Sequence, residues 1–352
     1  MPLLALYREA VRRRYDVESG ADEIHRVRCA DGVMVSLKRF RPVGTPTGRL
    51  PVLCIPGLGA DSTNFDAPAP YGLGPWLASQ GFDTWAIDLR GTGLSKLPMR
   101  TWMEVSFDDY VGLDLPAAID HVCATAGVPR VALVGHSMGG LVIYASLASG
   151  RGARIAAGIT IGSPLGFPQG WEVAPFLRPL LPLSSLAPGL LVGEISRLLT
   201  PLAMRVELPI LSRWLKLDNM DRSFARRLMY RAVQDVPRGL MLQFMEWIES
   251  DQFRSVDGAL DYRAGLHGCR SPVLVVGAPG DGLARLDSVH RAVELMPNAT
   301  FLLAGRAGGM STDYGHVDVV FGLHAYKEVF PHLGSFLERE ARAGRRNLVA
   351  VS

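Results

Sequence analysis

Short apolar runs alternate with longer amphipathic stretches through most of the chain. Each apolar run ends at or just before a glycine, proline or aspartate, which is typical of a buried strand. The predicted strands cover residues 50–55, 82–87, 131–134, 155–161, 272–277 and 300–304, and the predicted helices cover residues 71–80, 107–126, 141–150, 286–296 and 323–341. This alternation predicts an α/β fold with a mostly parallel, twisted sheet and helices on both faces.

Two further elements are expected before this region. The first ten residues, from Met1 to Ala10, resemble the start of a helix. Residues 24–29 and 33–41 flank Ala30-Asp31-Gly32, a turn signal that predicts an antiparallel hairpin.

Between residues 165 and 270 the alternation is lost, and the sequence is rich in leucine, proline, methionine and aromatic residues. We interpret residues 165–270 as a helical cap inserted into a core of residues 1–164 and 271–352. The longest uncharged run of the insertion, residues 179–193, contains Pro182 and Pro188. It is shorter than the roughly 20 residues that a spanning helix needs, so no transmembrane segment is expected.

One stretch of the insertion has helical periodicity. Met241, Phe244, Met245 and Ile248 follow i, i+3, i+4, i+7 spacing, which places them on one face of a helix. Two interpretations stay open: the stripe packs on the core, or it forms an apolar ceiling over an active site. On the second interpretation Met241, Phe244, Met245 and Trp247 line a substrate pocket.

The strand that begins at Val131 leads into Gly135-His136-Ser137-Met138-Gly139, and a predicted helix follows. A serine on such a tight strand-to-helix turn is held in strained backbone geometry with its hydroxyl raised above the sheet, and its neighbours two positions away must be nearly free of side chain. Ser137 is therefore a candidate nucleophile. The Met138 N–H, at the start of the helix, is a candidate oxyanion donor. The alternative is a glycine-rich turn with an incidental serine.

Composition and charge narrow the class of protein. Hydrophobic residues make up 48% of the 352-residue chain and charged residues 20%, which excludes a disordered protein. The net charge is +3 with a pI near 8.7, and it comes mainly from scattered arginines, so no nucleic-acid groove is expected. We interpret Arg12-Arg13-Arg14 and Arg345-Arg346 as solvated faces.

The cysteines and the first residues bear on the cellular compartment. Cys29, Cys54, Cys123 and Cys269 lie far apart and show no metal-ligand spacing, so we expect reduced, structural thiols and no metal. The first ten residues reach charge too soon for the apolar region of a signal peptide. A cytoplasmic protein is expected.

A serine hydroxyl needs a general base at neutral pH, and histidine is the usual one. In an open α/β sheet ligands meet the carboxyl ends of the strands, so the base should lie in a loop that leaves a strand. His316 lies in the loop after the last predicted strand and is the candidate base. The other histidines lie in predicted helices, in the hairpin, in the serine turn or at the cap junction: His25, His121, His136, His267, His290, His324 and His332.

A carboxylate is needed to orient the imidazole and to stabilise its charged form. Asp281 follows a predicted strand in a loop rich in glycine and proline, and the order Ser137, Asp281, His316 fits this architecture. Asp313 and Asp318 are alternatives, since they lie nearer to His316 in sequence. The second oxyanion donor is expected from the loop after residues 50–55, at the Leu58 N–H.

These motifs resemble those of the α/β-hydrolases over nearly everything outside the cap. The similarity rests on Pro56-Gly-Leu-Gly59, Asp88-Leu-Arg-Gly-Thr-Gly-Leu-Ser95, Gly135–Gly139, the loop from Gly277 to Asp281, and His316. It implies an α/β-hydrolase fold with Ser137 as nucleophile, Asp281 as acid, His316 as base, and Leu58 and Met138 as oxyanion donors. At Pro56 the chain departs from the pattern, because many members have a histidine there.

Within that superfamily, the segment Tyr314-Gly-His-Val-Asp-Val-Val-Phe-Gly322 is similar to the base loop of acid lipases and of polyhydroxyalkanoate synthases. The synthases use a cysteine nucleophile, whereas this chain has serine, which favours hydrolysis over polymerisation. The elbow also lacks the aspartate nucleophile of dehalogenases and epoxide hydrolases.

We therefore expect a serine esterase or lipase that acts on carboxylic esters with an apolar acyl part through an acyl-serine. The expected partner is a small apolar ester or thioester, and the chemistry requires no metal or organic cofactor. Two alternatives stay open: an acyltransferase or thioesterase that uses the same acyl-enzyme, and a catalytically silent binding protein that kept the fold. The sequence does not indicate an oligomeric state.

Overall fold

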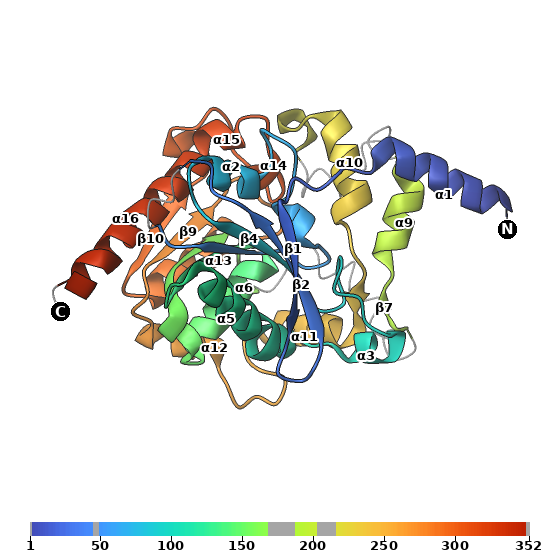
Figure 1. Cartoon of the computed structure of the whole chain (residues 1–352). Coiled ribbons are helices and arrows are strands. Elements are labelled where there is room, and N and C mark those ends of the chain that lie inside the picture. Colours follow the sequence, from blue (N-terminus) through green and yellow to red (C-terminus); the bar gives the residue numbers. More distant parts are fainter. Residues whose placement is uncertain (1, 45–48, 168–186, 203–215, 350–352) are drawn as a thin grey trace.

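A twisted sheet forms the centre of the molecule (Figure 1). The computed structural model describes residues 2–44, 49–167, 187–202 and 216–349. Within these ranges the sheet has eight strands in the order β1-β2-β4-β3-β5-β6-β9-β10. Their bounds are Glu23–Arg28 (β1), Met34–Phe40 (β2), Val52–Ile55 (β3), Thr84–Asp88 (β4), Val131–His136 (β5), Ile155–Ile161 (β6), Val273–Gly277 (β9) and Ala299–Leu303 (β10).

The sheet is parallel except at one edge, where β1 and β2 form the predicted hairpin. β1 pairs antiparallel with β2, β2 pairs antiparallel with β4, and every other neighbouring pair is parallel. The hairpin turn closes with the Cys29 N–H donating to the Val33 carbonyl at 2.8 Å, and Gly32 has φ 88°. This topology confirms the mostly parallel, twisted sheet that the sequence predicts.

Helices cover both faces of the sheet because its inner strands are apolar on both sides. In β5, Val131 and Leu133 enter one hydrophobic core, whereas Ala132 and Val134 enter the other. The first core contains residues of α5 (Leu115–Ala126), α6 (Met138–Ala148) and α13 (Leu286–Leu295). The second contains residues of α2 (Leu73–Ser79) and α16 (Phe330–Val349).

Two predicted helices are interrupted, and each interruption lies at a proline. The predicted helix 107–126 consists of α4 (Phe107–Asp109), a wider turn over Tyr110–Asp114, and α5, with Pro116 in the first turn of α5. The predicted helix 323–341 divides into α15 (Ala325–Glu328) and α16, with Pro331 in the first turn of α16. Proline lacks the N–H that an uninterrupted helix would use at these positions.

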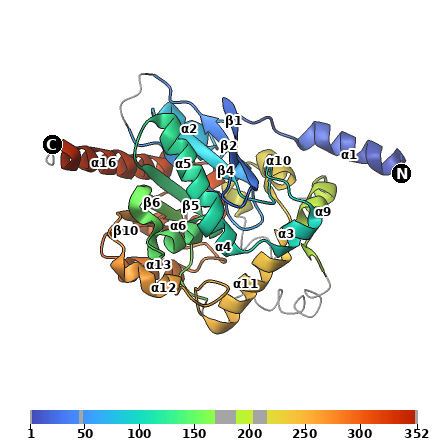
Figure 2. The ribbon, with the colours of Figure 1, turned by 60° about the horizontal axis from the view of Figure 1, so that its bottom comes forward.

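The described parts of the predicted cap are mainly helical and lie beside the sheet (Figure 2). They comprise a two-stranded ribbon of β7 (Gly189–Leu190) and β8 (Val236–Pro237), and the helices α9 (Val192–Leu199), α10 (Arg222–Ala232), α11 (Arg238–Ser250) and α12 (Tyr262–Gly265). Residues 168–186 and 203–215, which include part of the uncharged run 179–193, lie outside the described residues. The division at residues 165 and 270 stays a prediction. No described helix has the length and apolarity needed to cross a membrane.

Three further α-helices complete the set in the described residues. They are α1 (Pro2–Tyr15), α3 (Met99–Glu104) and α14 (Asp318–Phe321). α1 extends from one side of the molecule, and α16 extends from the opposite side (Figure 1).

The four cysteines are free and buried, as predicted for structural thiols. Burial raises the pKa of Cys29 to about 12 and raises the pKa of Cys54 further. A thiol with a raised pKa is a poor nucleophile and a poor metal ligand at neutral pH.

The turn between β5 and α6 packs directly on the end of β3. A Cβ atom added at Gly139 would lie 2.0 Å from the Ile55 carbonyl oxygen, and one added at Gly135 would lie 2.4 Å from the Gly139 carbonyl carbon. Both obstacles are backbone atoms, which cannot move aside as a flexible side chain can. The turn therefore requires glycine at both positions, as the sequence pattern predicts.

We expect Gly139→Ala to lower the free energy of unfolding by about 1–3 kcal/mol, since the added methyl group forces β3 and the turn apart. Gly112→Ala is the matched control, because an added Cβ there meets no atom within 4 Å. That control should leave stability unchanged or raise it by about 0.5–1 kcal/mol. Chemical denaturation measures both variants, and equal effects would contradict the packing argument.

Candidate active site

Ser137 has the strained backbone conformation that the elbow motif predicts. Its φ and ψ are 55° and −118°, and among the described residues only one other non-glycine, Asp251, has positive φ. Such a conformation costs on the order of 1–3 kcal/mol and persists only where neighbours hold it. The Ser137 N–H donates to the Ile161 carbonyl at 2.8 Å, and the Ser137 carbonyl accepts from the Ser163 hydroxyl at 2.8 Å.

His316 and Asp281 lie together at the carboxyl ends of β10 and β9. The His316 Nδ1 is 2.8 Å from Asp281 Oδ2, and both side chains are buried. The other carboxylate oxygen, Oδ1, accepts from the Leu283 and Ala284 N–H groups, each at 2.8 Å. These bonds fix the carboxylate, so it can hold the imidazole with Nδ1 protonated.

The alternative carboxylates have other partners. Asp318 accepts from the Gly315 N–H at 3.0 Å and from the Asn219 side-chain amide at 2.8 Å. Asp313 accepts from the Arg306 N–H at 2.9 Å. The carboxylate that contacts His316 is thus Asp281, although both alternatives lie nearer in sequence.

His136, beside Ser137, connects three loops of the site. One ring nitrogen, Nε2, lies 2.9 Å from the His316 carbonyl oxygen, and the other, Nδ1, lies 3.1 Å from Asn64 Oδ1. Burial and the neighbouring His316 lower the pKa of His136 to about 3, so the ring is neutral at pH 7. A neutral imidazole carries one N–H, so it donates in only one of these contacts.

The expected oxyanion loop follows β3 and lies against the elbow. A Cβ added at Gly57 would lie 3.3 Å from the Ser137 Cβ, and the Gly57 N–H donates to Asn64 Oδ1 at 3.1 Å. Leu58 is the next residue and is 39% exposed, whereas Met138, the first residue of α6, is buried. The two candidate donors therefore belong to different segments, the loop after β3 and the start of α6.

Several residues from the predicted cap contact the loops of the site. The Gln234 side-chain amide donates to Asp61 Oδ2 at 2.9 Å, and its backbone N–H donates to the Gly59 carbonyl at 2.8 Å. Lys216 donates to the Asp313 carbonyl at 2.7 Å, and Asn219 holds Asp318. Residues of the predicted cap are thus bonded to both the oxyanion loop and the base loop.

Sequence reasoning did not identify several of these supporting residues. Ser163, Asn64, Gln234 and Lys216 carry no motif of their own, and their partners lie far away in the chain. His136 was visible in the motif, but we considered it only as a base for its neighbour. The one available clue for Ser163 was its place directly after a predicted strand, at the same sheet edge as the triad.

The predicted pocket residues of α11 are buried in an aromatic cluster. Met241, Phe244, Met245 and Trp247 belong to one hydrophobic core. The Trp247 ring lies 4.9 Å, centroid to centroid, from both Phe107 and Phe253, and its N–H donates to the Arg254 carbonyl at 2.9 Å. This supports the interpretation of a stripe packed on the core. Contact between these four side chains and a substrate stays a prediction.

No group of three or more histidine, cysteine, aspartate or glutamate side chains within the described ranges has the geometry to hold a metal ion. The carboxyl edge of the sheet carries a hydroxyl on a strained turn and an imidazole oriented by a carboxylate, with two candidate oxyanion donors in neighbouring segments. These are the components of nucleophilic acyl transfer.

Comparison with known proteins agrees with this architecture. Residues 51–186 match the family model described as the alpha/beta hydrolase fold. The chain is 33% identical to triacylglycerol lipase 2 of Arabidopsis thaliana over 137 residues, which are 35% of this chain and 32% of that protein. It is 33% identical to human lysosomal acid lipase/cholesteryl ester hydrolase over 128 residues, 33% of this chain and 32% of the relative. The matched part thus spans about a third of each relative's length.

The fold also matches solved structures. An esterase from Rhodococcus sp. ECU1013 superposes with a TM-score of 0.57 and 20% identity, covering 90% of this chain and 98% of the other. The similarity to this structure concerns the fold, and the relation to lipases comes from the sequence. The chain is an α/β-hydrolase-fold protein related in sequence to lipases, among them a lysosomal acid lipase.

Proposed function

We propose that the protein is a serine hydrolase that cleaves carboxylic esters with an apolar acyl part through an acyl-serine intermediate. The observation that carries this proposal is the His316–Asp281 pair, 2.8 Å apart, at the same sheet edge as the strained Ser137. The backbone of Ser137, at φ 55°, is strained. Such strain is typical of a nucleophile on a strand-to-helix turn.

The proposed reaction begins when Ser137 Oγ attacks the ester carbonyl carbon. His316 Nε2 accepts the hydroxyl proton, since Asp281 occupies Nδ1. The negative charge that develops on the carbonyl oxygen is stabilised by the Met138 and Leu58 N–H groups. As the tetrahedral intermediate collapses, the C–O bond to the alcohol breaks, and the alcohol leaves with the proton from His316.

The acyl-serine is then hydrolysed by the same residues, with water as the nucleophile and Ser137 as the leaving group. His316 accepts a proton from water, the hydroxide oxygen bonds to the acyl carbon, and Ser137 leaves with the returned proton. No step requires a metal or an organic cofactor. The preference for an apolar acyl group is supported by the sequence relation to lipases and by the apolar character of α11, whose Phe244 and Met241 we propose as part of the acyl wall.

Ser137→Ala should abolish labelling by a fluorophosphonate probe and reduce ester turnover to background, because it removes the attacking oxygen. Ser149→Ala, at the end of α6, is the control and should keep both activities, since its hydroxyl bonds only within its own helix, to the Ala145 carbonyl. In-gel fluorescence and a p-nitrophenyl ester assay measure the two effects. Undiminished turnover in Ser137→Ala would refute the proposed function.

Asp281→Asn should reduce kcat on the order of 10⁴-fold, the scale of the equivalent change in the serine-protease template, because an amide favours the wrong imidazole tautomer. Asp313→Asn is the matched control and should stay within a few-fold of the wild type, since Asp313 bonds Arg306 rather than His316. Steady-state kinetics on one ester compares them. If Asp281→Asn stays active, a carboxylate other than Asp281 orients His316.

If Met241 and Phe244 of α11 contact the acyl group, kcat/KM should depend on the length of the acyl chain. Each methylene removed from water contributes about 0.8 kcal/mol, so kcat/KM should rise up to roughly fourfold per added carbon until the site is full. Phe244→Ala should flatten this dependence while acetate hydrolysis changes much less. A series of p-nitrophenyl esters measures it, with a melting curve to show that the variant is folded. If acetate is the best substrate, the proposed apolar specificity is wrong.

A further inference from the structure

More than half of the exposed large apolar side chains in the described residues lie on or beside two helices. Among the described residues, nine of the sixteen exposed large hydrophobic side chains belong to α1, to α9 or to residues flanking α9. They are Leu3, Leu4, Leu6, Tyr7, Leu191, Val192, Ile195, Leu199 and Leu202. We call this set, together with the arginines of α1, the α1–α9 surface. Apolar side chains exposed in a contiguous group mark an interaction site, whereas scattered ones do not.

α1 packs on the body of the protein along only one side. Val11 and Tyr15 are buried, the Tyr7 hydroxyl donates to the Leu198 carbonyl at 2.8 Å, and Arg8 pairs with Glu194 at 2.6 Å. Leu3 is 81% exposed and Leu6 is 67% exposed. The contacts that hold α1 against α9 thus leave its leucines in solvent.

α9 also presents an apolar stripe to solvent. Val192, Ile195 and Leu199, followed by Leu202 just beyond the helix, repeat at intervals of three, four and three residues, which places them along one face. The other side of α9 faces α10, where the Ser196 hydroxyl donates to the Met229 carbonyl at 2.9 Å. Both ribbon views place α1 and α9 side by side at one edge of the molecule (Figures 1 and 2).

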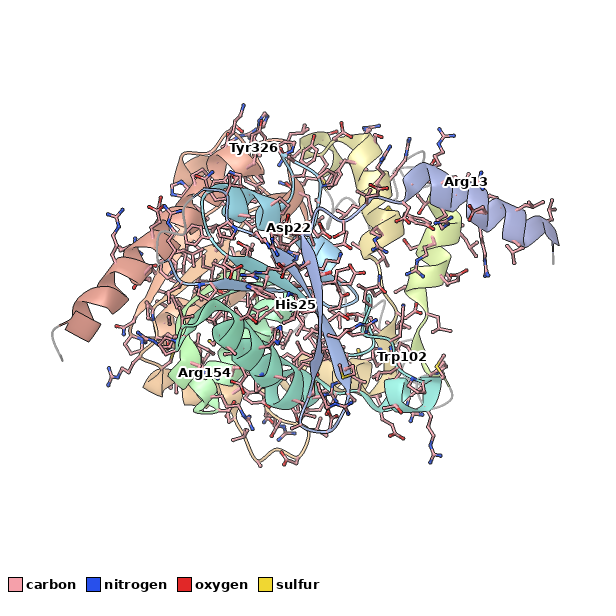
Figure 3. The ribbon with its side chains drawn as sticks, viewed as in Figure 1. Arg13, Asp22, His25, Trp102, Arg154 and Tyr326 are labelled. Atoms are coloured by element: carbon pink, nitrogen blue, oxygen red, sulfur yellow. The ribbon has the colours of Figure 1, made fainter. Side chains whose placement is uncertain are left out.

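The same surface is basic. α1 and α9 together carry five arginines and two glutamates, a net charge of +3, which equals the formal net charge of the whole chain. Arg13 is 77% exposed and stands on α1 away from the rest of the molecule (Figure 3). It lies seven residues, about two turns, after Leu6, so the two share a face of the helix.

The charge and the apolarity of the α1–α9 surface together favour one of two binding partners, an anionic lipid surface or a second copy of the chain. A second copy of the chain would pair the surface with itself across a two-fold axis and bring +3 against +3. An anionic lipid surface satisfies both properties, since leucine and isoleucine enter the boundary between headgroups and acyl chains while arginines meet the headgroup charges. The long arginine side chains can reach headgroups while their stems stay in apolar surroundings.

We propose that the α1–α9 surface docks the protein on an anionic lipid bilayer without spanning it. Leu3, Leu6 and the stripe of α9 enter the headgroup boundary, and Arg13 and Arg14 contact the anionic headgroups. This inference goes beyond the proposed ester hydrolysis and does not depend on it, because it concerns a surface built from residues outside the triad.

The test is vesicle co-sedimentation of the full chain carrying Ser137→Ala, so that any lipid hydrolysis is absent from the readout. The probes are vesicles of phosphatidylcholine alone and vesicles of equal parts phosphatidylcholine and phosphatidylglycerol. The protein should bind the anionic vesicles, bind the neutral ones far more weakly, and lose binding as salt is raised.

Variants locate the surface. Arg13→Gln with Arg14→Gln should lower the partition coefficient about 25-fold, about fivefold for each charge lost. Leu3→Ser with Leu6→Ser should lower it by about tenfold or more. Val256→Ser with Leu260→Ser, and Arg342→Gln on α16, are controls at exposed positions elsewhere and should leave binding unchanged. Circular dichroism shows that each variant is folded.

Absence of binding to the anionic vesicles would overturn the proposal, as would an equal loss of binding in the control variants. Light scattering measures whether the protein is a dimer. If it is a dimer, does not bind vesicles, and becomes monomeric in the Leu3→Ser, Leu6→Ser variant, the α1–α9 surface contacts a second copy of the chain instead. If the wild-type protein shows no esterase activity, the proposed function is refuted, but the vesicle-binding result still stands.

Discussion

The close approach of the β5–α6 turn to the end of β3 is the constraint on which the site depends. A Cβ at Gly139 would lie 2.0 Å from the Ile55 carbonyl oxygen, so the turn fits only with glycine there. The other side of the turn is fixed by β6, through the bonds of Ser137 to Ile161 and Ser163. Because β5 lies between β3 and β6, the strain of Ser137 is held from both neighbouring strands.

The loops that leave these strands are bonded to one another, so the candidate triad does not rely on any single loop. His136 of the elbow contacts the backbone of His316, and the Gly280 N–H donates to the Tyr314 carbonyl at 2.9 Å, joining the acid loop to the base loop. Gln234 and Lys216 connect the predicted cap to the same loops. Such connections keep reacting groups in place, which is what positioning catalysis requires.

The sequence predicted what depends on local pattern and missed what depends on distant contacts. The strands, the hairpin and the elbow follow from apolar runs, from Gly32 and from Gly135 and Gly139, so the fold was accessible without coordinates. The helix interruptions at Pro116 and Pro331 were not predicted, because helical periodicity continues across them. Arg12-Arg13-Arg14 is exposed, as the sequence predicts, but nothing in the sequence shows that α1 lies beside the apolar stripe of α9.

The central claim is that an ester reacts by transferring its acyl group to Ser137. The most direct measurement is acid-quenched mass spectrometry during turnover of a p-nitrophenyl ester, followed by peptide mapping. The account predicts a transient adduct with the mass of the acyl group, confined to the peptide that contains Ser137. Steady ester turnover with no adduct, or an adduct on a different residue, would contradict it.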